Sequence, residues 1–347
     1  MKLLCICILL AVGIFLVMPF HGSTQSNTQQ SSAPVRAELP LQLYEQVPLP
    51  GLAGRIDHFT ADKKRRRVIF SALGNNSVEV VDAFAGAPIR SIKEGLSEPQ
   101  GVLYIDGLNK LFVANAGNGK VMIFNGDSFK LEKTIEVGDD PDNLRYHEAT
   151  KRVIVGYGSD GGAFATFDAA TGERVGKDLK IDGHPESFEI EQKGNRIFVN
   201  VPDARAVEVV DRNTGAVTKW PLTGVRGNYA MALNEDDHRL FVSTRKIPMF
   251  LVFDTESGRE VARMPAVGSC DDVSYDALRK RAYVIGAQGF ISVFQQKDPE
   301  HYELLANVPS AVGVRTGYFF VRRDRLYVGV PARGNEPAQL WTYEAQD

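Results

Sequence analysis

A short pattern of polar and apolar positions recurs along the chain. A basic residue opens a run of β-branched, aromatic or other apolar residues, and a small polar turn follows, as in the segment from Arg196 to Asn200. Seven such runs begin at Arg67, Lys110, Arg152, Arg196, Arg239, Arg281 and Arg325, at intervals of 42 to 44 residues. A repeat of this length, built from short strands, is typical of a β-propeller with one four-stranded blade per repeat. The pattern therefore predicts an all-β, seven-bladed β-propeller.

A second pattern marks the third strand of each predicted blade. An apolar residue precedes an acid or an amide at Val81-Asp82, Phe124-Asn125, Phe167-Asp168, Val210-Asp211 and Phe253-Asp254. Turn-forming residues follow, such as Thr171-Gly172, and they suit a tight hairpin into the fourth strand. The last two repeats depart from this pattern, because Phe294-Gln295 and Tyr343-Glu344 stand in the corresponding places.

The last blade lacks a fourth strand of its own, because only four residues follow Tyr343. Residues 41–51 read as a fourth strand and resemble residues 131–138 of the second blade. We therefore expect the N-terminal strand to pair with the last blade and close the ring. Closure removes the open sheet edges that promote aggregation. The propeller domain is predicted to span residues 41–347.

The N-terminus predicts export. Lys2 is followed by an uncharged apolar run over residues 3–20, which is typical of a signal peptide and is also just long enough for a membrane span. We assign residues 1–22 to a signal peptide or an uncleaved membrane anchor, and residues 23–40 to a flexible tether rich in Ser, Thr, Gln and Asn. The expected location is periplasmic or extracellular. Removal of the signal leaves Cys270 as the only cysteine, so we expect no intramolecular disulfide. We also expect a monomer.

The repeats resemble the YVTN/YncE-like family, which consists of seven-bladed propellers exported by bacteria. The segment Leu111-Phe112-Val113-Ala114-Asn115 is a degenerate form of the Tyr-Val-Thr-Asn signature, and the resemblance covers about residues 41–347. It implies a propeller fold and an exported location. For function it implies only that one branch of the family has a DNA-binding activity.

Composition and motifs exclude several classes of function. The net charge of −3 gives no general attraction to nucleic acid. Gly156, Gly158 and Gly161 have the spacing of a dinucleotide-binding loop, but an alternating strand pattern follows them where a helix is needed. His147-Glu148 begins like a zinc-protease motif, but Lys151 stands where the second His is required. We therefore expect no cofactor and no metal.

Polar groups gather in the segments that connect the fourth strand of one blade to the first strand of the next. In a propeller these segments surround one mouth of the central channel. The predicted funnel contains Arg55, Asp57, His58, Gln100, Asn143, His184, Glu186, Asn228, Asp271, Asp272 and Arg315. Such a concavity suits a small polar ligand, a peptide or a protein partner, although a channel filled with water would tolerate the same residues. The sequence thus favours a binding or scaffold protein.

An enzyme is the first alternative. Seven-bladed propellers of related repeat pattern include sugar-lactone hydrolases, which would use the same funnel. His58, His184 and Glu186 are then the candidate bases, and Arg315 would stabilise an oxyanion. The sequence contains no G-x-S-x-G nucleophile motif, so the question of catalysis stays open.

A basic face is the second alternative site. The turns between the first and second strands of blades 6, 7 and 1 carry Lys63, Lys64, Arg65, Arg66, Arg67, Arg279, Lys280, Arg281, Arg322, Arg323 and Arg325. These blades are neighbours in a closed ring, so the basic turns should form one sector. The sector suits a weak contact with an anionic membrane surface, whereas the negative net charge and the export signal argue against nucleic acid. Solvated turns without a partner would show the same charges.

Overall fold

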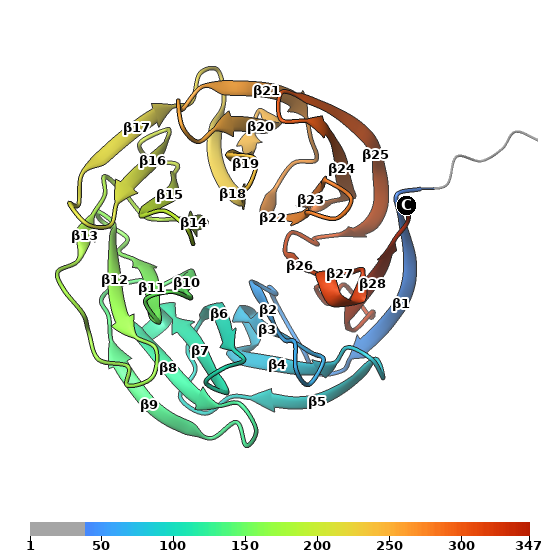
Figure 1. Ribbon diagram of the computed structural model, residues 1–347. Helices are drawn as coiled ribbons and strands as arrows, with labels where there is room; N and C mark the ends of the chain where they lie inside the picture. Colours follow the sequence, from blue (N-terminus) through green and yellow to red (C-terminus); the bar gives the residue numbers. More distant parts are fainter. Residues whose placement is uncertain (1–38) are drawn as a thin grey trace, which may run out of the picture. The chain divides into compact units, whose positions relative to one another are not determined.

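The computed structural model describes residues 39–347, which form an all-β ring of seven blades around a central channel (Figure 1). The predicted seven-bladed β-propeller is confirmed. The predicted signal peptide or anchor and nearly all of the predicted tether lie outside the described residues. Within the described part of the chain, no helix is long and apolar enough to cross a membrane.

Each blade is a four-stranded antiparallel sheet, and in blades 1 to 6 the strands follow the chain from the channel outward. Blade 1 contains β2 (Phe59–Asp62), β3 (Arg67–Ala72), β4 (Ser77–Asp82) and β5 (Ala87–Ile92). Blade 2 contains β6 (Pro99–Ile105), β7 (Lys110–Asn115), β8 (Lys120–Asn125) and β9 (Leu131–Glu136). Blade 3 contains β10 (Leu144–His147), β11 (Arg152–Tyr157), β12 (Ala163–Asp168) and β13 (Leu179–Lys180). Blade 4 contains β14 (Phe188–Ile190), β15 (Arg196–Val201), β16 (Ala206–Asp211) and β17 (Val217–Pro221).

The remaining blades are longer or less regular. Blade 5 contains β18 (Arg226–Asn234), β19 (Arg239–Lys246), β20 (Pro248–Asp254) and β21 (Glu260–Pro265). Blade 6 contains β22 (Cys270–Asp276), β23 (Arg281–Gly286), β24 (Gln288–Asp298) and β25 (His301–Val312). Blade 7 contains β26 (Gly317–Phe320), β27 (Arg325–Val330) and β28 (Ala338–Ala345). Three single-turn helices interrupt the loops: η1 (Leu73–Asn75), η2 (Ala116–Asn118) and η3 (Val321–Arg323).

The outer strand of blade 7 comes from the other end of the described chain. Strand β1 (Leu41–Leu49) pairs antiparallel with β28, so that Leu41 lies opposite Ala345 and Leu49 lies opposite Ala338. In Figure 1 the blue β1 runs along the outside of the red β28. The first and last strands of the propeller therefore share one sheet.

The strand register explains why a basic residue recurs in the sequence. In all seven blades the basic residue that begins the second strand lies directly opposite the acid or amide that ends the third strand or stands near its end. In four blades the two side chains contact each other directly, as where Arg239 bonds Asp254 at 2.6 Å and is almost completely buried. In the other three blades Arg67, Lys110 and Arg196 pair with a nearby acid instead. Opposite charges across a strand pair stabilise the sheet. The repeated basic position is thus part of the fold.

The acid at the end of the third strand also shapes the following turn. Asp82, Asp168 and Asp211 each accept hydrogen bonds from the backbone N–H groups two and three residues ahead. This contact is a side-chain mimic of a backbone turn. In blade 6 the same contact is made by Asp298 instead of Gln295, because β24 extends further. The departure of this repeat from the sequence pattern is therefore a longer hairpin.

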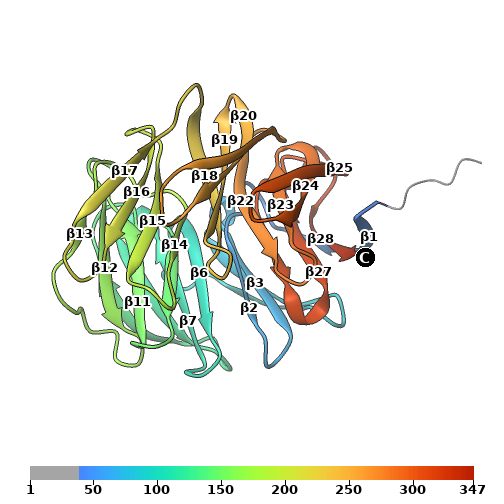
Figure 2. The same cartoon turned by 45° about the horizontal axis from the view of Figure 1, so that its top comes forward.

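The apolar core lies between blades rather than inside them. Seven clusters of buried side chains fill the seven spaces between neighbouring blades. Aromatic residues of the second strands, such as Phe112, Phe198 and Phe241, are completely buried there. Because each blade needs both neighbours to cover its faces, the ring is stable only when it is complete. Figure 2 shows the blades packed face to face around the channel.

Strand directions give the ring two different faces. The connections between blades and the loops between second and third strands lie on one face, which we call the funnel face. The turns between first and second strands lie on the opposite face together with those between third and fourth strands, as the bond from Ala83 N to Arg66 O shows. We call this second face the turn face.

Candidate functional site

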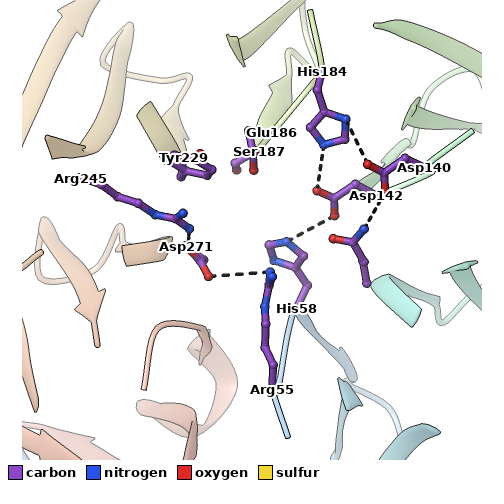
Figure 3. A pocket seen from close by; sticks show the side chains of 11 residues that line it. Arg55, His58, Asp140, Asp142, His184, Glu186, Ser187, Tyr229, Arg245 and Asp271 are labelled. Carbon is purple, nitrogen blue, oxygen red and sulfur yellow. Dashed lines mark hydrogen bonds and ion pairs between the residues drawn. The ribbon is translucent and has the colours of Figure 1, made fainter. Parts of the chain in front are cut away.

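A polar cavity of about 230 Å³ occupies the mouth of the channel on the funnel face (Figure 3). Its lining comes from six blades and consists of Arg55, His58, Gln100, Asp140, Asp142, His184, Glu186, Ser187, Tyr229, Arg245 and Asp271. Eight of these residues carry basic or acidic groups that face one another at short range. Figure 3 shows Arg55, Arg245 and Asp271 on one side of the cavity and His184 with Asp140 and Asp142 on the other.

Three arginines surround one carboxylate on the first side of the cavity. Asp271 contacts Arg245, and its Oδ2 lies 3.9 Å from Arg55 and 3.7 Å from Arg315. Arg245 also lies over the ring of Tyr229, with 3.4 Å between the guanidinium carbon and the ring centroid. Burial and the charge of Arg55 lower the pKa of Arg315. Arg55 is also paired with both carboxylate oxygens of Asp57, at 3.0 and 2.9 Å, so Asp271 serves mainly Arg245 and Arg315.

His58 links the two sides. Its Nδ1 lies 3.1 Å from Asp272, and its Nε2 lies 3.2 Å from Asn143 and 3.6 Å from Asp142. Burial opposes protonation, but Asp272 and the buried Asp57 outweigh it and raise the pKa of His58 to about 10. His58 also lines the larger cavity that continues along the channel towards the turn face. A positively charged imidazole therefore stands between the two cavities.

His184 is held on the second side by two acids. Its Nδ1 lies 3.6 Å from Asp140 and 3.0 Å from the Gly158 carbonyl oxygen, and its Nε2 lies 3.8 Å from Asp142. Burial opposes protonation here too, but Asp142 and Glu186 raise the pKa of His184 to about 9. His184 is therefore protonated at neutral pH and serves as a counter-ion for the acids.

Glu186 differs from the other acids of the cavity. Among residues 39–347 no hydrogen bond or salt bridge to its carboxylate is found, whereas its backbone N–H is bound to Asn200 O at 3.1 Å. Burial and the neighbouring Asp142 raise the pKa of Glu186 to about 7. Glu186 can therefore take up or release a proton near neutral pH, as a general acid or base does.

One trio of side chains has the donor atoms of a cation site. Ligand atoms of Asp142, His184 and Glu186 all lie within 4.8 Å of one another. An imidazole nitrogen and carboxylate oxygens are each known ligands of divalent metal ions such as zinc. The raised pKa of His184 opposes metal binding, because a cation would have to displace its proton. The trio thus fits a divalent cation in the number and type of its ligands, but binding would require His184 to lose its proton.

The predicted funnel residues occupy three kinds of place. Six line the cavity: Arg55, His58, Gln100, His184, Glu186 and Asp271. Asp57, Asn143, Asp272 and Arg315 stand behind them and contact lining side chains. Asn228 lies apart, because it is completely buried and donates to Asn200 Oδ1 and Ala206 O at 2.9 Å. Its role is to join blades 4 and 5.

The sequence reasoning left out five lining residues: Asp140, Asp142, Ser187, Tyr229 and Arg245. Arg245 comes from a second strand, not from a connection between blades. It reaches the cavity because β19 has eight residues whereas the other second strands have six. The acidic run around Asp140 was visible in the sequence, but only Asn143 was selected from it.

The basic residues of blades 6, 7 and 1 divide into two groups. Arg65, Arg67, Arg279 and Arg325 form salt bridges, Arg281 is buried and bonds Gln295, and Arg323 bonds Ala83 O. Lys63, Lys64, Arg66, Lys280 and Arg322 are exposed on the turn face. The first group holds the turns together, so only the second group is available to a partner.

Comparisons with known proteins define the fold. No protein-family model matches the chain. No curated protein matches it either. Among solved structures, the hydrazine synthase of Kuenenia stuttgartiensis is 16% identical and has a TM-score of 0.69, over 86% of this chain and 95% of that chain. The WD40 repeats of RRP9 and the structure of U3-55K are each 10% identical, with TM-scores of 0.75 and 0.74, over 88% of this chain and 98% of theirs.

These similarities show that the chain has a seven-bladed β-propeller fold. Sequence identities this low do not show a shared family or a shared function. The YVTN/YncE-like family stays a resemblance. A propeller fold is consistent with a binding or scaffold role.

Proposed function

We propose that this chain is an exported binding protein whose funnel holds a small, hydroxyl-rich organic anion. The carrying observation is the convergence of Arg55, Arg245 and Arg315, from three different blades, on the single carboxylate of Asp271. Guanidinium groups bind carboxylates through paired, charge-assisted hydrogen bonds. A ligand carboxylate beside Asp271 would give a second acceptor to Arg245 and Arg315, which share that carboxylate, whereas Arg55 is already paired with Asp57. The proposal of export rests on Lys2 and the apolar run that follows it.

The opposite side of the cavity supports the second part of the proposal. Asp140, Asp142 and Glu186 present oxygen acceptors there, and His184 presents a donor. Ligand hydroxyl groups can donate to such acceptors, whereas a second ligand carboxylate would be repelled by them. The favoured ligand therefore carries its charge at one end and hydroxyl groups at the other, as a sugar acid does.

The size of the cavity favours a small molecule over a peptide. Its volume of about 230 Å³ lies below the roughly 300–1,000 Å³ of most small-molecule pockets. Most of the polar groups are also paired with one another, so the site is held in shape before a ligand arrives. Such preorganisation lowers the entropic cost of binding.

Titration calorimetry tests this proposal. Gluconate and glucuronate serve as probes, and glucose is the uncharged counterpart. We expect the two acids to bind and glucose not to bind measurably. Arg245→Gln should weaken binding about ten- to hundredfold, because a charge-assisted hydrogen bond is lost.

The matched control is Arg226→Gln, which changes an exposed arginine of the same blade outside the cavity lining. Its affinity should equal that of the wild type. Equal binding of glucose and the acids, or no binding of any probe, would refute the proposed ligand class.

A lactone hydrolase is the second candidate function, and Glu186 is the observation that favours it. A carboxyl group with a pKa of about 7 beside a cationic His184 could accept a proton from a water molecule that attacks a lactone carbonyl. The proton would then pass to the leaving hydroxyl group, and the product would be a hydroxy acid of the class proposed above.

A panel of sugar lactones separates the two candidates. Turnover by the wild type that falls at least about a hundredfold in Glu186→Gln, and also falls in His58→Ala, would establish hydrolysis. If sugar acids bind but no lactone is hydrolysed, the lactone hydrolase is excluded and the binding function remains.

A further inference from the structure

Five cationic side chains are exposed together on the turn face of blades 6, 7 and 1. They are Lys63, Lys64, Arg66, Lys280 and Arg322, which we call the basic sector. No salt bridge involves any of them among residues 39–347, whereas Arg279 and Arg325 of the same turns are paired with acids. The basic sector therefore presents its charge to the surroundings.

Exposed apolar side chains lie in or beside these turns: Leu278 and Val321 belong to them, and Phe84 lies in the neighbouring turn between β4 and β5. Leu278, Phe84 and Val321 are 74%, 64% and 59% exposed, and they are the three most exposed of the large hydrophobic residues in the described chain. We call them the apolar tips. The corresponding turn of blade 5 carries Glu235 and Asp236 instead. An exposed cluster of this kind in a soluble domain usually marks an interaction surface.

Contacts between the turns make the basic sector and the apolar tips one surface. The guanidinium carbons of Arg66 and Arg323 lie 4.9 Å and 5.1 Å from the ring centroid of Phe84, so blades 1 and 7 meet there. Arg279 donates to Asp324 Oδ1 at 2.9 Å and joins blade 6 to blade 7.

The described chain begins beside this surface. Pro40 O accepts a hydrogen bond from Gln346 N at 3.0 Å, and Ala345 N donates to Asp324 O at 3.0 Å. Asp324 follows η3, which carries one apolar tip and one basic residue of the surface. The 38 residues that precede this point include the uncharged apolar run of residues 3–20. Between residues 20 and 39 the chain can span at most about 65 Å.

We propose that this surface docks onto an anionic lipid bilayer. The apolar tips would enter the headgroup region, while the basic sector would face the lipid phosphates. Exposed hydrophobic groups together with several cations give the two signals that stable attachment to a lipid surface needs. The funnel would then open away from the membrane, on the opposite face.

Lipid fits the surface better than nucleic acid does. A nucleic acid would attract the cations through its phosphates, but the exposed aliphatic side chains of Leu278 and Val321 would stay in water. The negative net charge of the chain also gives no general attraction to nucleic acid. This inference does not depend on the ligand of the funnel, so either proposal can fail without the other.

Hydrogen exchange of the full-length chain in lipid nanodiscs tests the proposal. One set of discs contains phosphatidylcholine only, and the other also contains phosphatidylglycerol. We expect backbone amides of residues 63–66, 277–280 and 321–324 to exchange at least about fivefold more slowly on the anionic discs at low salt. High salt should abolish the difference, because the screening length then shortens to a few Å. Since the anchor is present in both sets, the difference reports this surface.

Two variants make the test specific. Replacing all five residues of the basic sector by Gln should remove the protection, and circular dichroism should show that the fold is unchanged because these side chains are exposed. The control is Lys151→Gln with Lys193→Gln, two exposed lysines in the turns of blades 3 and 4 on the same face. The control should keep the protection.

Equal exchange on both kinds of disc, or loss of the protection in the control variant, would overturn the proposal. Protection of the same turns by an RNA oligonucleotide, unaffected by Phe84→Ser with Leu278→Ser, would also overturn it and assign the surface to nucleic acid.

Discussion

The two ends of the second strand differ in what they repeat. At the turn face the strand begins with a basic residue in every blade, and an acid or amide faces it across the sheet. At the funnel face the strand ends in a different residue in almost every blade, including Ala72, Asn115, Tyr157 and Val201. The repeated end holds each blade together. The end that varies contributes one side chain to the cavity, Arg245 of β19, and the other lining residues come from the first strands and the connections between blades on the same face.

This comparison predicts that the contacts within the blade sheets stabilise the fold. Loss of a whole strand should therefore have the largest effect. Deletion of residues 41–49 removes β1 and leaves β28 as an open edge that is apolar on its inner side. We expect aggregation and no cooperative melting transition, measured by size-exclusion chromatography and thermal denaturation. Deletion of residues 24–32, which has the same length, should leave the melting temperature unchanged. A β1 deletion that stays monomeric and melts like the wild type would contradict the prediction.

A single repeated residue should have a smaller effect. Arg67 is buried and bonds the completely buried Asp62 through Nε at 2.9 Å and Gly126 O at 2.7 Å. Arg67→Ala removes the buried guanidinium that pairs with Asp62 and leaves the carboxylate with its contacts to Arg65, so we expect the free energy of unfolding to fall by about 3 kcal/mol. Its neighbour Arg66 is exposed, and Arg66→Ala should change stability by less than about 0.5 kcal/mol. Denaturant unfolding of both variants measures the difference, and equal effects would show that the repeated position is not special.

The same distinction explains how much the sequence could predict. The blades were predictable because Arg67, Phe112, Asp168 and their counterparts obey one local rule at a fixed interval. The tight turns after the third strands were predictable for the same reason.

The cavity was only partly predictable, because its contacts join residues far apart in the chain. His58 meets Asp272 across 214 positions and Asn143 across 85, and no local pattern records such pairs. Arg245 was overlooked because it reaches the cavity through two extra residues of β19. The sequence places Asn228 near the start of an innermost strand, where a funnel residue is expected, yet its side chain turns into the space between blades. The propeller topology therefore predicts where the site lies, but the direction of each side chain decides which residues line it.

The smallest expected effect on stability concerns the funnel. If the funnel face is built for ligand binding, some of its side chains should destabilise the fold. Glu186 has a carboxyl pKa of about 7 when folded, above its ordinary value of 4.5. A raised carboxyl pKa means that the folded state loses stability as the pH rises from 4.5 to about 7, because the ionised form is disfavoured by burial and by Asp142. His184 adds to this loss at higher pH, because its stabilising charge disappears as the pH passes about 9.

Glu186→Gln removes the ionisation and keeps the shape of the side chain. At pH 8 it should therefore raise the melting temperature by about 2–4 °C, and the gain should vanish below pH 4.5, where the wild-type carboxyl is already neutral. The matched control is Glu189→Gln in the same blade, which breaks the 3.0 Å salt bridge to Arg145 and should not raise the melting temperature. Thermal melts of the three proteins between pH 4 and pH 9 measure both effects. A Glu186→Gln protein that is less stable than the wild type at pH 8 would show that this carboxylate is held by the fold, and that the funnel follows the same rule as the repeated end of the strands.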